Sequence, residues 1–367
     1  METGPIVKLG RYEVRDKIAA GGMATVYKAV QTGVGGFRSQ VALKLLHPHL
    51  ANEDSYRRMF HEEARIGALL EHRCLLKVLD FGDEEGIYFI VTEYFPSLSL
   101  EELVTKTRRV PLAEALFVLC EAAEGLEALH QARDIEGKKR LGLIHRDVSP
   151  QNVLVGTDGR VKLIDYGIVK RADPTEKTRA GIVKGKVRYM SPEQAAGGMV
   201  DIRSDLFSLG VVFLRCVTGE KPHGSGDTGE LLASVRTGKD IARLLAAASL
   251  PAPVSALLDR MLSQDPAGRP STAGEVAVEA RKLLNDTAPG YEVHAFRAWL
   301  DKSKATRRPP RRKGKTEVVK EPEPSQAPRP LPAATGIHPR WVFMGLLALF
   351  LAALLAYLAD LFFGRGG

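Results

Sequence analysis

The chain has 367 residues, of which 44% are hydrophobic and 26% charged, a composition typical of a globular protein with one large domain or two ordinary ones. Its formal net charge of +8 is contained in residues 302–340, where eleven Lys and Arg accompany three Glu; the rest is neutral and gives no support to a nucleic-acid-binding domain. Three scattered cysteines, Cys74, Cys120 and Cys216, exclude a disulfide framework and a cysteine-based metal site.

A β-hairpin is predicted near the N-terminus. Polar and apolar residues alternate over 12–18, a turn of small residues follows at 19–24, and a second strand returns over 25–30. Gly21 and Gly22 in the turn would let backbone N–H groups approach a phosphate closely. On these residues alone, the stretch predicts a hairpin and nothing more.

Two elements follow that carry charged side chains in apolar surroundings. Residues 41–44 predict a strand that ends in Lys44, and residues 55–70 predict a helix that carries Glu62 and Glu63. By itself, a lysine on such a strand is normally solvated. These two elements alone therefore do not show whether Lys44 is solvated or pairs with one of the two glutamates; the motifs later in the chain bear on that choice.

The next elements lead towards the middle of the chain. Residues 87–91 predict a strongly apolar strand that ends at Thr92, and leucines spaced for one face predict a helix over 112–130. Residues 131–140 are polar and predict a solvent-exposed loop.

The stretch 144–154 places Asp147 and Asn152 five residues apart, in a turn that contains Pro150 and leads into an apolar run. Such a turn can hold a carboxylate against an acceptor hydroxyl while an amide oxygen reaches a metal ion. This arrangement is the one that phosphoryl transfer uses. A lone His-Arg-Asp tripeptide would otherwise predict a surface turn with a salt bridge.

A second motif follows the first at short distance. Residues 161–164 predict a strand that delivers Asp165-Tyr166-Gly167. In this order and spacing, the two stretches resemble the catalytic loop and metal-binding triplet of protein kinases, in the eukaryotic-like serine/threonine form found in bacteria. The resemblance covers residues 11–284 and implies an α+β, two-lobed protein kinase fold, with a β-rich N-lobe over about 11–93 and a helical C-lobe over about 96–284.

The resemblance implies a role for each polar residue of the predicted site. Asp147 would accept the proton of the acceptor hydroxyl, and Lys44 would hold the α- and β-phosphates of ATP while pairing with Glu63 rather than Glu62. Asn152 and Asp165 would bind Mg²⁺, or Mn²⁺ in its place. The residues implied to line the nucleotide pocket are Ile18, Gly21, Gly22, Val26, Ala42, Lys44, Thr92, Glu93, Phe95 and Leu154.

The resemblance also places an activation loop in the polar stretch from 170 to 187. Thr175 and Thr178 are the candidate phosphorylation sites there, and Arg146 is the residue that would capture a phosphothreonine. Two structural roles are implied further on: Asp205 would brace the backbone of the catalytic loop, and Arg269 would pair with Glu193.

Some positions depart from the family pattern. Ala19 and Ala24 replace two glycines of the first turn, Ser149 stands where a lysine usually follows the catalytic Asp, and Lys186 replaces a threonine. We expect Lys186 or Lys184 to supply a positive charge near the γ-phosphate.

The C-terminal part has a different composition. Residues 285–301 predict a terminal helical extension, and residues 302–340 contain eight of the 21 prolines and predict a basic, disordered linker. Residues 341–359 are uncharged and mostly apolar, and after Asp360 the apolar run continues over 361–363; together they predict a transmembrane helix. The basic flank before it predicts a single-pass protein of the cell (inner) membrane, with the catalytic domain in the cytoplasm.

Together these features predict a membrane-anchored serine/threonine protein kinase. We expect it to use ATP and Mg²⁺, to phosphorylate protein substrates, to be regulated by activation-loop autophosphorylation and to self-associate for that purpose. The alternative is a pseudokinase that serves as a membrane-tethered scaffold.

Overall fold

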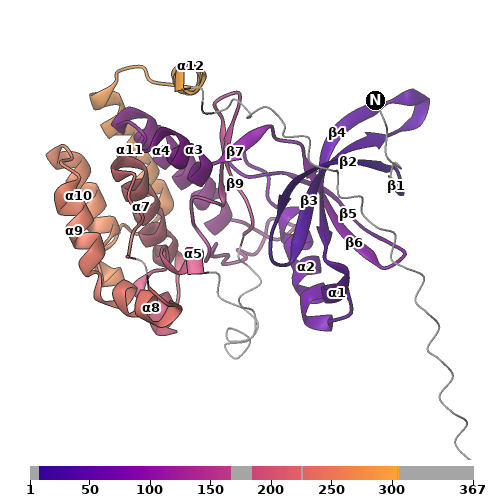
Figure 1. Ribbon diagram of the computed structural model, residues 1–367, viewed down its shortest axis with the longest axis horizontal. Helices are drawn as coiled ribbons and strands as arrows, with labels where there is room; N and C mark the ends of the chain where they lie inside the picture. The colour runs from indigo at the N-terminus through magenta and orange to yellow at the C-terminus, as the bar shows by residue number, and fades with distance from the viewer. Residues whose placement is uncertain (1–7, 167–183, 225, 304, 306–367) are drawn as a thin grey trace, which may run out of the picture. The chain divides into compact units, whose positions relative to one another are not determined.

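The structure is a computed structural model that describes residues 8–166, 184–224, 226–303 and 305. The chain divides into two units, Met1–Gly314 and Lys315–Gly367, and all described residues belong to the first. Within this unit, strands dominate the first hundred residues and helices the remainder, as Figure 1 shows. The expected two-lobed arrangement is confirmed.

The N-lobe is a six-stranded antiparallel sheet with two helices. The strand order is β1-β2-β3-β4-β6-β5. The predicted hairpin is confirmed as β2 and β3, and the strand of Lys44 as β4. The bounds are β1 (Lys8–Leu9), β2 (Tyr12–Ala20), β3 (Ala24–Thr32), β4 (Arg38–Leu46), α1 (Pro48–Ala51), α2 (Asp54–Gly67), β5 (Val78–Glu84) and β6 (Ile87–Glu93), with a 3₁₀ turn at Val34–Gly36.

The alternation of side chains along β4 and β6 builds two cores, one on each face of the sheet. Leu43 and Val91 pack with one face, whereas Leu46 and Ile90 pack with Phe60 of α2 on the other. A residue of β4 that points to the α2 side therefore faces the helix that carries Glu63.

Helix α2 ends three residues before the predicted position 70. After Gly67 the chain continues to Leu70 in a tighter turn. In this turn the N–H groups of Leu69 and Leu70 donate to the carbonyls three residues earlier, those of Ile66 and Gly67, at 2.9 and 3.3 Å. The apolar pattern continues through this turn, so periodicity alone extended the helix too far. A Cβ on Gly67 would lie 2.4 Å from a methyl group of Val78, which shows how closely the turn approaches β5.

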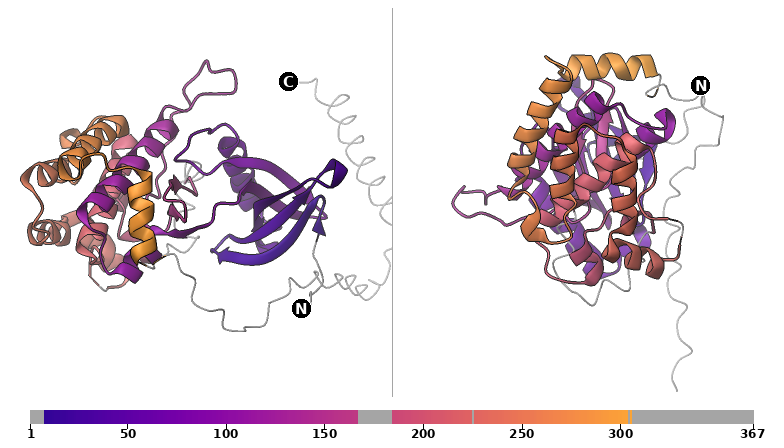
Figure 2. Two further views of the ribbon diagram at one scale, coloured as in Figure 1. Left: turned by 90° about the horizontal axis from the view of Figure 1, so that it is seen from above. Right: turned by 90° about the vertical axis from the view of Figure 1, so that its left-hand side faces the viewer.

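The C-lobe consists of helices and a small three-stranded sheet, ordered β7-β8-β9. Figure 2 shows the helices from two further directions. The bounds are β7 (Ser97–Ser99), α3 (Leu100–Thr107), α4 (Leu112–His130), β8 (Val153–Gly156), β9 (Val161–Leu163), α5 (Lys184–Val187), α6 (Pro192–Ala196), α7 (Ile202–Thr218), α8 (Thr228–Thr237), α9 (Lys239–Ala247), α10 (Ala252–Met261), a 3₁₀ turn at Pro266–Gly268, α11 (Ala273–Thr287) and α12 (Val293–Ser303).

Helix α4 has the predicted bounds and forms the centre of the C-lobe core. It packs against α7 and α11, and Gly125 permits a close approach to the segment that precedes β5. A Cβ on Gly125 would lie 3.0 Å from the carbonyl oxygen of Cys74 and 3.1 Å from the side chain of Leu163. This contact brings the strand that precedes Asp165 onto a rigid helix.

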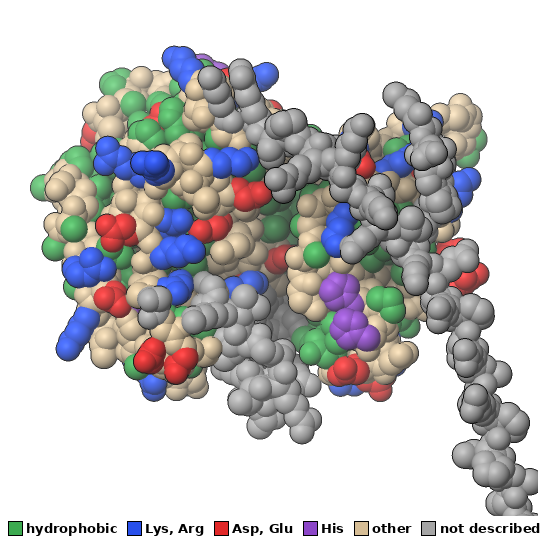
Figure 3. All heavy atoms as spheres, in the orientation of Figure 1, with side chains coloured by type: hydrophobic (Ala, Val, Ile, Leu, Met, Phe, Trp, Pro, Cys, Tyr) green, Lys and Arg blue, Asp and Glu red, His purple; other side chains and the backbone are tan. Residues whose placement is uncertain are grey.

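Residues 131–140 form a short hairpin on the outside of the C-lobe (Figure 2). Arg133 and Arg140 are bridged through their backbones, and Ile135 is exposed. On the face of the molecule shown in Figure 3, basic and acidic side chains are interspersed over the helical part.

None of the helices within the described ranges combines the length and apolar content that crossing a membrane would require. The predicted span at 341–363 and the linker at 302–340 lie outside those ranges, apart from the end of α12 and Ala305.

Candidate active site

A lysine between two carboxylates joins the two lobes. Lys44 lies on β4, and its Nζ is 2.5 Å from Oε1 of Glu63 on α2 and 2.6 Å from Oδ1 of Asp165, which follows β9. Glu62 lies on the same helix but pairs with Arg65, at 2.6 Å. The predicted pairing of Lys44 with Glu63 rather than Glu62 is thus present, and the structure adds a contact of Lys44 with Asp165 that the sequence analysis did not predict.

Within this triad, Lys44 and Asp165 each favour the charged form of the other, whereas burial, with Asp165 nearby, raises the pKa of Glu63 in spite of Lys44. Burial opposes the charge of Lys44, but the carboxylates of Asp165 and Glu63 outweigh it and raise the lysine pKa above its ordinary value. Lys44 in turn is the main cause of a lowered pKa at Asp165. Asp165 is therefore ionised at neutral pH and able to bind a cation.

The catalytic loop is braced from beneath by Asp205 on α7. Its two carboxylate oxygens accept hydrogen bonds from the backbone N–H groups of His145 and Arg146, each at 2.8 Å. Arg146 has φ +61°, a conformation that costs energy and needs such support. Nε2 of His130 lies 2.8 Å from the same carboxylate, a buried contact that the sequence analysis missed.

Asn152 fixes the other end of this loop. Its side-chain nitrogen donates to the backbone carbonyl of Asp147 at 2.8 Å. Its backbone carbonyl accepts a hydrogen bond from the N–H of Ile164 at 3.0 Å. The loop is thereby linked to the residues that lead into Asp165. Because the amide nitrogen is used within the loop, the amide oxygen is the group of Asn152 that is suited to a cation.

The carboxylate of Asp147 forms an ion pair with Lys186, which lies on the short helix α5. Asp147 is largely buried, with 10% of its side chain exposed, whereas Lys186 is one-third exposed. The side chain of Lys184 lies outside the described residues, as do Gly167, Thr175 and Thr178.

The predicted pocket residues lie on neighbouring strands of the two lobes. In the sheet register, Val26 is opposite Lys44, and Ala42 is opposite Thr92. Ile18 is 44% exposed near the tip of the hairpin, and Leu154 is half-buried on β8.

The protein's own packing does not explain the glycines of the hairpin turn. A Cβ on Gly22 would meet nothing within 4 Å, and a Cβ on Gly21 would lie an ordinary 3.6 Å from the carbonyl oxygen of Ala24. Neither residue has a positive φ. The absence of side chains here is therefore suited to the close approach of a ligand.

The segment that connects the lobes is fixed by a buried lysine that the sequence analysis missed. Nζ of Lys162 on β9 donates to the carbonyl of Leu75 at 3.0 Å and to Oε1 of Glu93 at 2.8 Å. The same Oε1 accepts from the N–H of Lys77 at 2.9 Å. Phe95 lies nearby, with its ring centroid 5.6 Å from Nζ of Lys162. The sequence signal that could have indicated this buried contact is a lysine between two apolar residues of β9.

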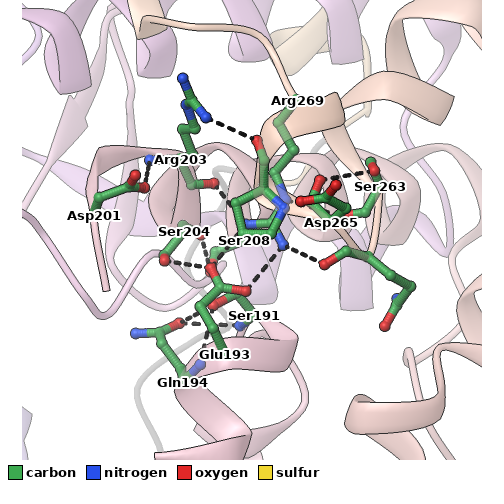
Figure 4. Close-up of polar contacts among 12 residues, drawn as sticks. Ser191, Glu193, Gln194, Asp201, Arg203, Ser204, Ser208, Ser263, Asp265 and Arg269 are labelled. Atoms are coloured by element: carbon green, nitrogen blue, oxygen red, sulfur yellow. Dashed lines mark hydrogen bonds and ion pairs between the residues drawn. The ribbon is translucent and has the colours of Figure 1, made fainter. Parts of the chain in front are cut away.

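A second polar network holds the C-lobe below the site, and Figure 4 shows it. The guanidinium of Arg269 is buried and binds both carboxylate oxygens of Glu193, at 2.8 and 2.9 Å. Its remaining N–H groups donate to the carbonyls of Ser263, Arg203 and Gln264. Every donor of the guanidinium thus has a partner. The predicted pairing with Glu193 is present.

This network should make stability depend on pH in the acid range. Burial raises the pKa of Glu193, but hydrogen bonds from Arg269 and Ser204 outweigh it and lower the pKa to about 2, from an ordinary 4.5. The stabilisation is complete above pH 4.5 and is lost as the pH falls towards 2. The free energy of unfolding, measured against pH, should decline less steeply in this window for Glu193→Gln than for the wild type; equal slopes would contradict this assignment.

Comparison with known proteins decides the identity of this arrangement. The model of the protein kinase domain family matches residues 12–285. The chain belongs to the protein kinase family. The serine/threonine kinase PknL of Mycobacterium tuberculosis is 33% identical over 289 residues, which are 78% of this chain and 69% of PknL. The bacterial kinase domain that the motifs predicted is thereby confirmed.

Other relatives of the kinase are longer proteins. The tyrosine-protein kinase MasK of Myxococcus xanthus is 35% identical over 295 residues, which are 79% of this chain and 46% of MasK. PrkC, a serine/threonine kinase of Bacillus subtilis, is 31% identical, over 75% of this chain and 41% of PrkC. The chain thus spans less than half the length of these two relatives.

Solved structures agree with this fold. The crystal structure of the PknI kinase domain of Mycobacterium tuberculosis is 26% identical and has a TM-score of 0.53; the match covers 77% of this chain and 99% of that one.

The donor set of the kinase fits a magnesium ion. Asp165 supplies an ionised carboxylate and Asn152 an amide oxygen, while Lys44 takes one oxygen of Asp165. Mg²⁺ is usually held by one or two protein oxygens together with phosphates and water. Asp165 and Asn152 would hold such an ion, which would supply positive charge to a nucleotide's phosphates.

Removal of the Lys44 charge should reduce phosphoryl transfer. We expect Lys44→Met to lower kcat about 100-fold or more, because both ion pairs of the triad disappear at once. Lys106→Met on α3, where Nζ donates to the carbonyl of Ala305, is the matched control and should keep its activity. Initial rates with labelled ATP measure both; full activity of Lys44→Met would contradict the assigned role.

Proposed function

We propose that this kinase transfers the γ-phosphate of ATP to serine and threonine hydroxyls of protein substrates. The observation that carries the proposal is the joint placement of Lys44, Glu63 and Asp165 with Asp147 and Asn152, from both lobes, around one site. The names of PknL and PrkC favour serine and threonine as acceptors.

The residues of the site have separate tasks in this reaction. Lys44 positions the α- and β-phosphates and is itself held by Glu63. Asp147 orients the acceptor hydroxyl and takes its proton as the oxygen attacks phosphorus. The bound Mg²⁺ supplies positive charge for the phosphate oxygens. The remaining work is orientation, which the braces at Asp205 and Asn152 provide.

We further propose that residues 341–363 anchor the chain in the cell (inner) membrane, with the kinase domain in the cytoplasm. The support is the sequence: an apolar run of sufficient length, uncharged over 341–359 and interrupted only by Asp360, with a basic segment before it. After an alkaline wash, the full chain should remain with membranes, whereas a variant without 341–363 should be released. Release of the full chain would refute the anchor.

Autophosphorylation at Thr175 or Thr178 is the regulation that we propose. Arg146, next to the catalytic Asp147, is the residue suited to bind the resulting phosphothreonine. Tethering to a bilayer would raise the local concentration of neighbouring kinases, so reaction between two copies is expected. An autophosphorylation rate per molecule that does not depend on concentration would exclude that route.

The test of the function uses the full chain in detergent with Mg²⁺, labelled ATP and a generic basic protein, followed by analysis of the labelled amino acids and mapping of the sites. Phosphoserine or phosphothreonine is the expected product. Label on tyrosine alone would show that the kinase acts on tyrosine, as the name of the relative MasK states for that protein. Nucleotide binding without transfer would favour the pseudokinase scaffold.

A further inference from the structure

Lys186 contributes a positive charge at the centre of the site from outside the catalytic loop. Its Nζ pairs with the carboxylate of Asp147. The ammonium group therefore lies at the carboxylate that is proposed to take the acceptor proton.

The backbone of this lysine is held firmly on its C-terminal side. Val187 is fully buried and packs against Leu231 and Val235 of α8. The N–H of Tyr189 donates to the carbonyl of Lys186 at 3.1 Å. The lysine that pairs with Asp147 is thus carried by a segment whose backbone is fixed against α8.

The same segment is also tied to the catalytic loop. The side chain of Gln194, in the capping box of α6, donates to the carbonyl of Arg146 at 3.1 Å. The guanidinium of Arg188 donates to carbonyls of the α7–α8 connection, including that of Pro222 at 3.2 Å. These contacts fix Lys186 relative to Asp147 from two directions.

The catalytic loop itself has no cation at the expected place. Ser149, two residues after Asp147, is 1% exposed, and its Oγ has no hydrogen-bond partner within the described part of the chain. The pattern expected for the family has a lysine at this position and a threonine at 186. In this chain, a hydroxyl and an ammonium group have exchanged places.

We propose that Lys186 is a catalytic residue whose ammonium group contacts the γ-phosphate of ATP in the reacting complex, in place of the lysine that the catalytic loop lacks at Ser149. This inference rests on the proposed phosphoryl transfer. Because an ammonium group has three donors, Lys186 can contact phosphate oxygens without giving up Asp147.

The transfer step then balances as follows. The acceptor oxygen forms a bond to the γ-phosphorus, and the bond from that phosphorus to the β–γ bridging oxygen breaks. ADP leaves with the electron pair, and the acceptor proton passes to Asp147. Lys186 stays protonated throughout and neutralises charge on the transferred group.

An exchange of the two side chains tests this assignment in the full chain in detergent. Lys186→Thr should lower kcat about 10²- to 10³-fold, the usual effect of removing one charge-stabilising donor. The double variant Lys186→Thr with Ser149→Lys should regain at least about tenfold of that loss, since the cation returns by the other route. Ser149→Lys alone should not exceed the wild type, and Lys184→Ala should stay close to it.

Nucleotide affinity provides a second readout that needs no turnover. If Lys186 contacts the γ-phosphate, Lys186→Thr should weaken binding of a non-hydrolysable ATP analogue by about tenfold and leave the affinity for ADP unchanged, with Mg²⁺ present. Lys186→Met keeps the aliphatic part of the side chain and should behave in the same way; it replaces the threonine variant if that variant unfolds.

Two outcomes would overturn the proposal: wild-type turnover in Lys186→Thr or Lys186→Met, or a loss of turnover with unchanged discrimination between the ATP analogue and ADP. A wild-type protein that transfers no phosphate would instead refute the proposed function. The comparison of the two nucleotides would still test whether Lys186 faces the γ-phosphate.

Discussion

Replacement of Asp147 by Asn should reduce phosphoryl transfer by the kinase about 10³-fold or more. The variant keeps the backbone carbonyl that accepts from Asn152, so the loop retains its shape. What it loses is the group that takes the acceptor proton and orients the attack. The measurement is kcat with labelled ATP and a protein acceptor, beside the affinity for Mg²⁺–ATP, which should change little.

The control for this variant is Asp158→Asn, on the β8–β9 turn. Asp158 pairs with Arg160 at 2.7 Å, and its carboxylate also accepts from the backbone N–H of Arg160 at 3.0 Å within the same turn, so its removal should leave kcat unchanged. An Asp147→Asn protein that binds nucleotide and transfers phosphate at the wild-type rate would show that the proton acceptor lies elsewhere.

Replacement of Arg269 by Leu should destabilise the C-lobe by about 3–5 kcal/mol, the usual cost of leaving one partner of a buried ion pair alone. Glu193 would remain largely buried without its guanidinium partner, and three backbone carbonyls would lose the same partner. Denaturant unfolding, followed by circular dichroism, measures the change.

The matched variant is the double replacement of Arg269 by Leu and Glu193 by Gln. Because Gln removes the stranded charge, the double variant should be more stable than Arg269→Leu alone. Arg260→Leu, whose partners Glu275 and Glu279 are partly exposed, should cost under about 1 kcal/mol. An equal cost for Arg269→Leu and Arg260→Leu would show that burial of the Glu193 pair contributes little.

The sequence was sufficient to predict features with a short-range signature. The period of its leucines predicted α4 with its observed bounds, and the order of the motifs predicted the two lobes. The resemblance also predicted the pairing of Lys44 with Glu63, whereas the contact between Lys44 and Asp165 is seen only in the structure. The sequence left open whether Lys186 or Lys184 supplies a positive charge near the γ-phosphate, and it did not predict the ion pair of Lys186 with Asp147, which depends on how α5 packs against α8.

Long-range contacts of single polar residues were not predictable in this way. Lys162 lies within an apolar strand, where alternation predicts only that its side chain faces away from its neighbours. Its partner Glu93 is 69 residues earlier, and His130 is 75 residues before Asp205. No local sequence pattern predicts contacts between residues so far apart in the chain. These contacts follow from the packing of α4, α7 and β9.

The tie between the lobes at Lys162 links two binding events. Glu93 belongs to the strand end that is implied to border the adenine, and it is held by the strand that delivers Asp165 two residues later. A nucleotide that orders Glu93 would therefore also restrain β9, the strand that leads to the carboxylate suited to Mg²⁺. Thermodynamic reciprocity requires the converse, so the ion and the nucleotide should each tighten the binding of the other even where their atoms do not touch.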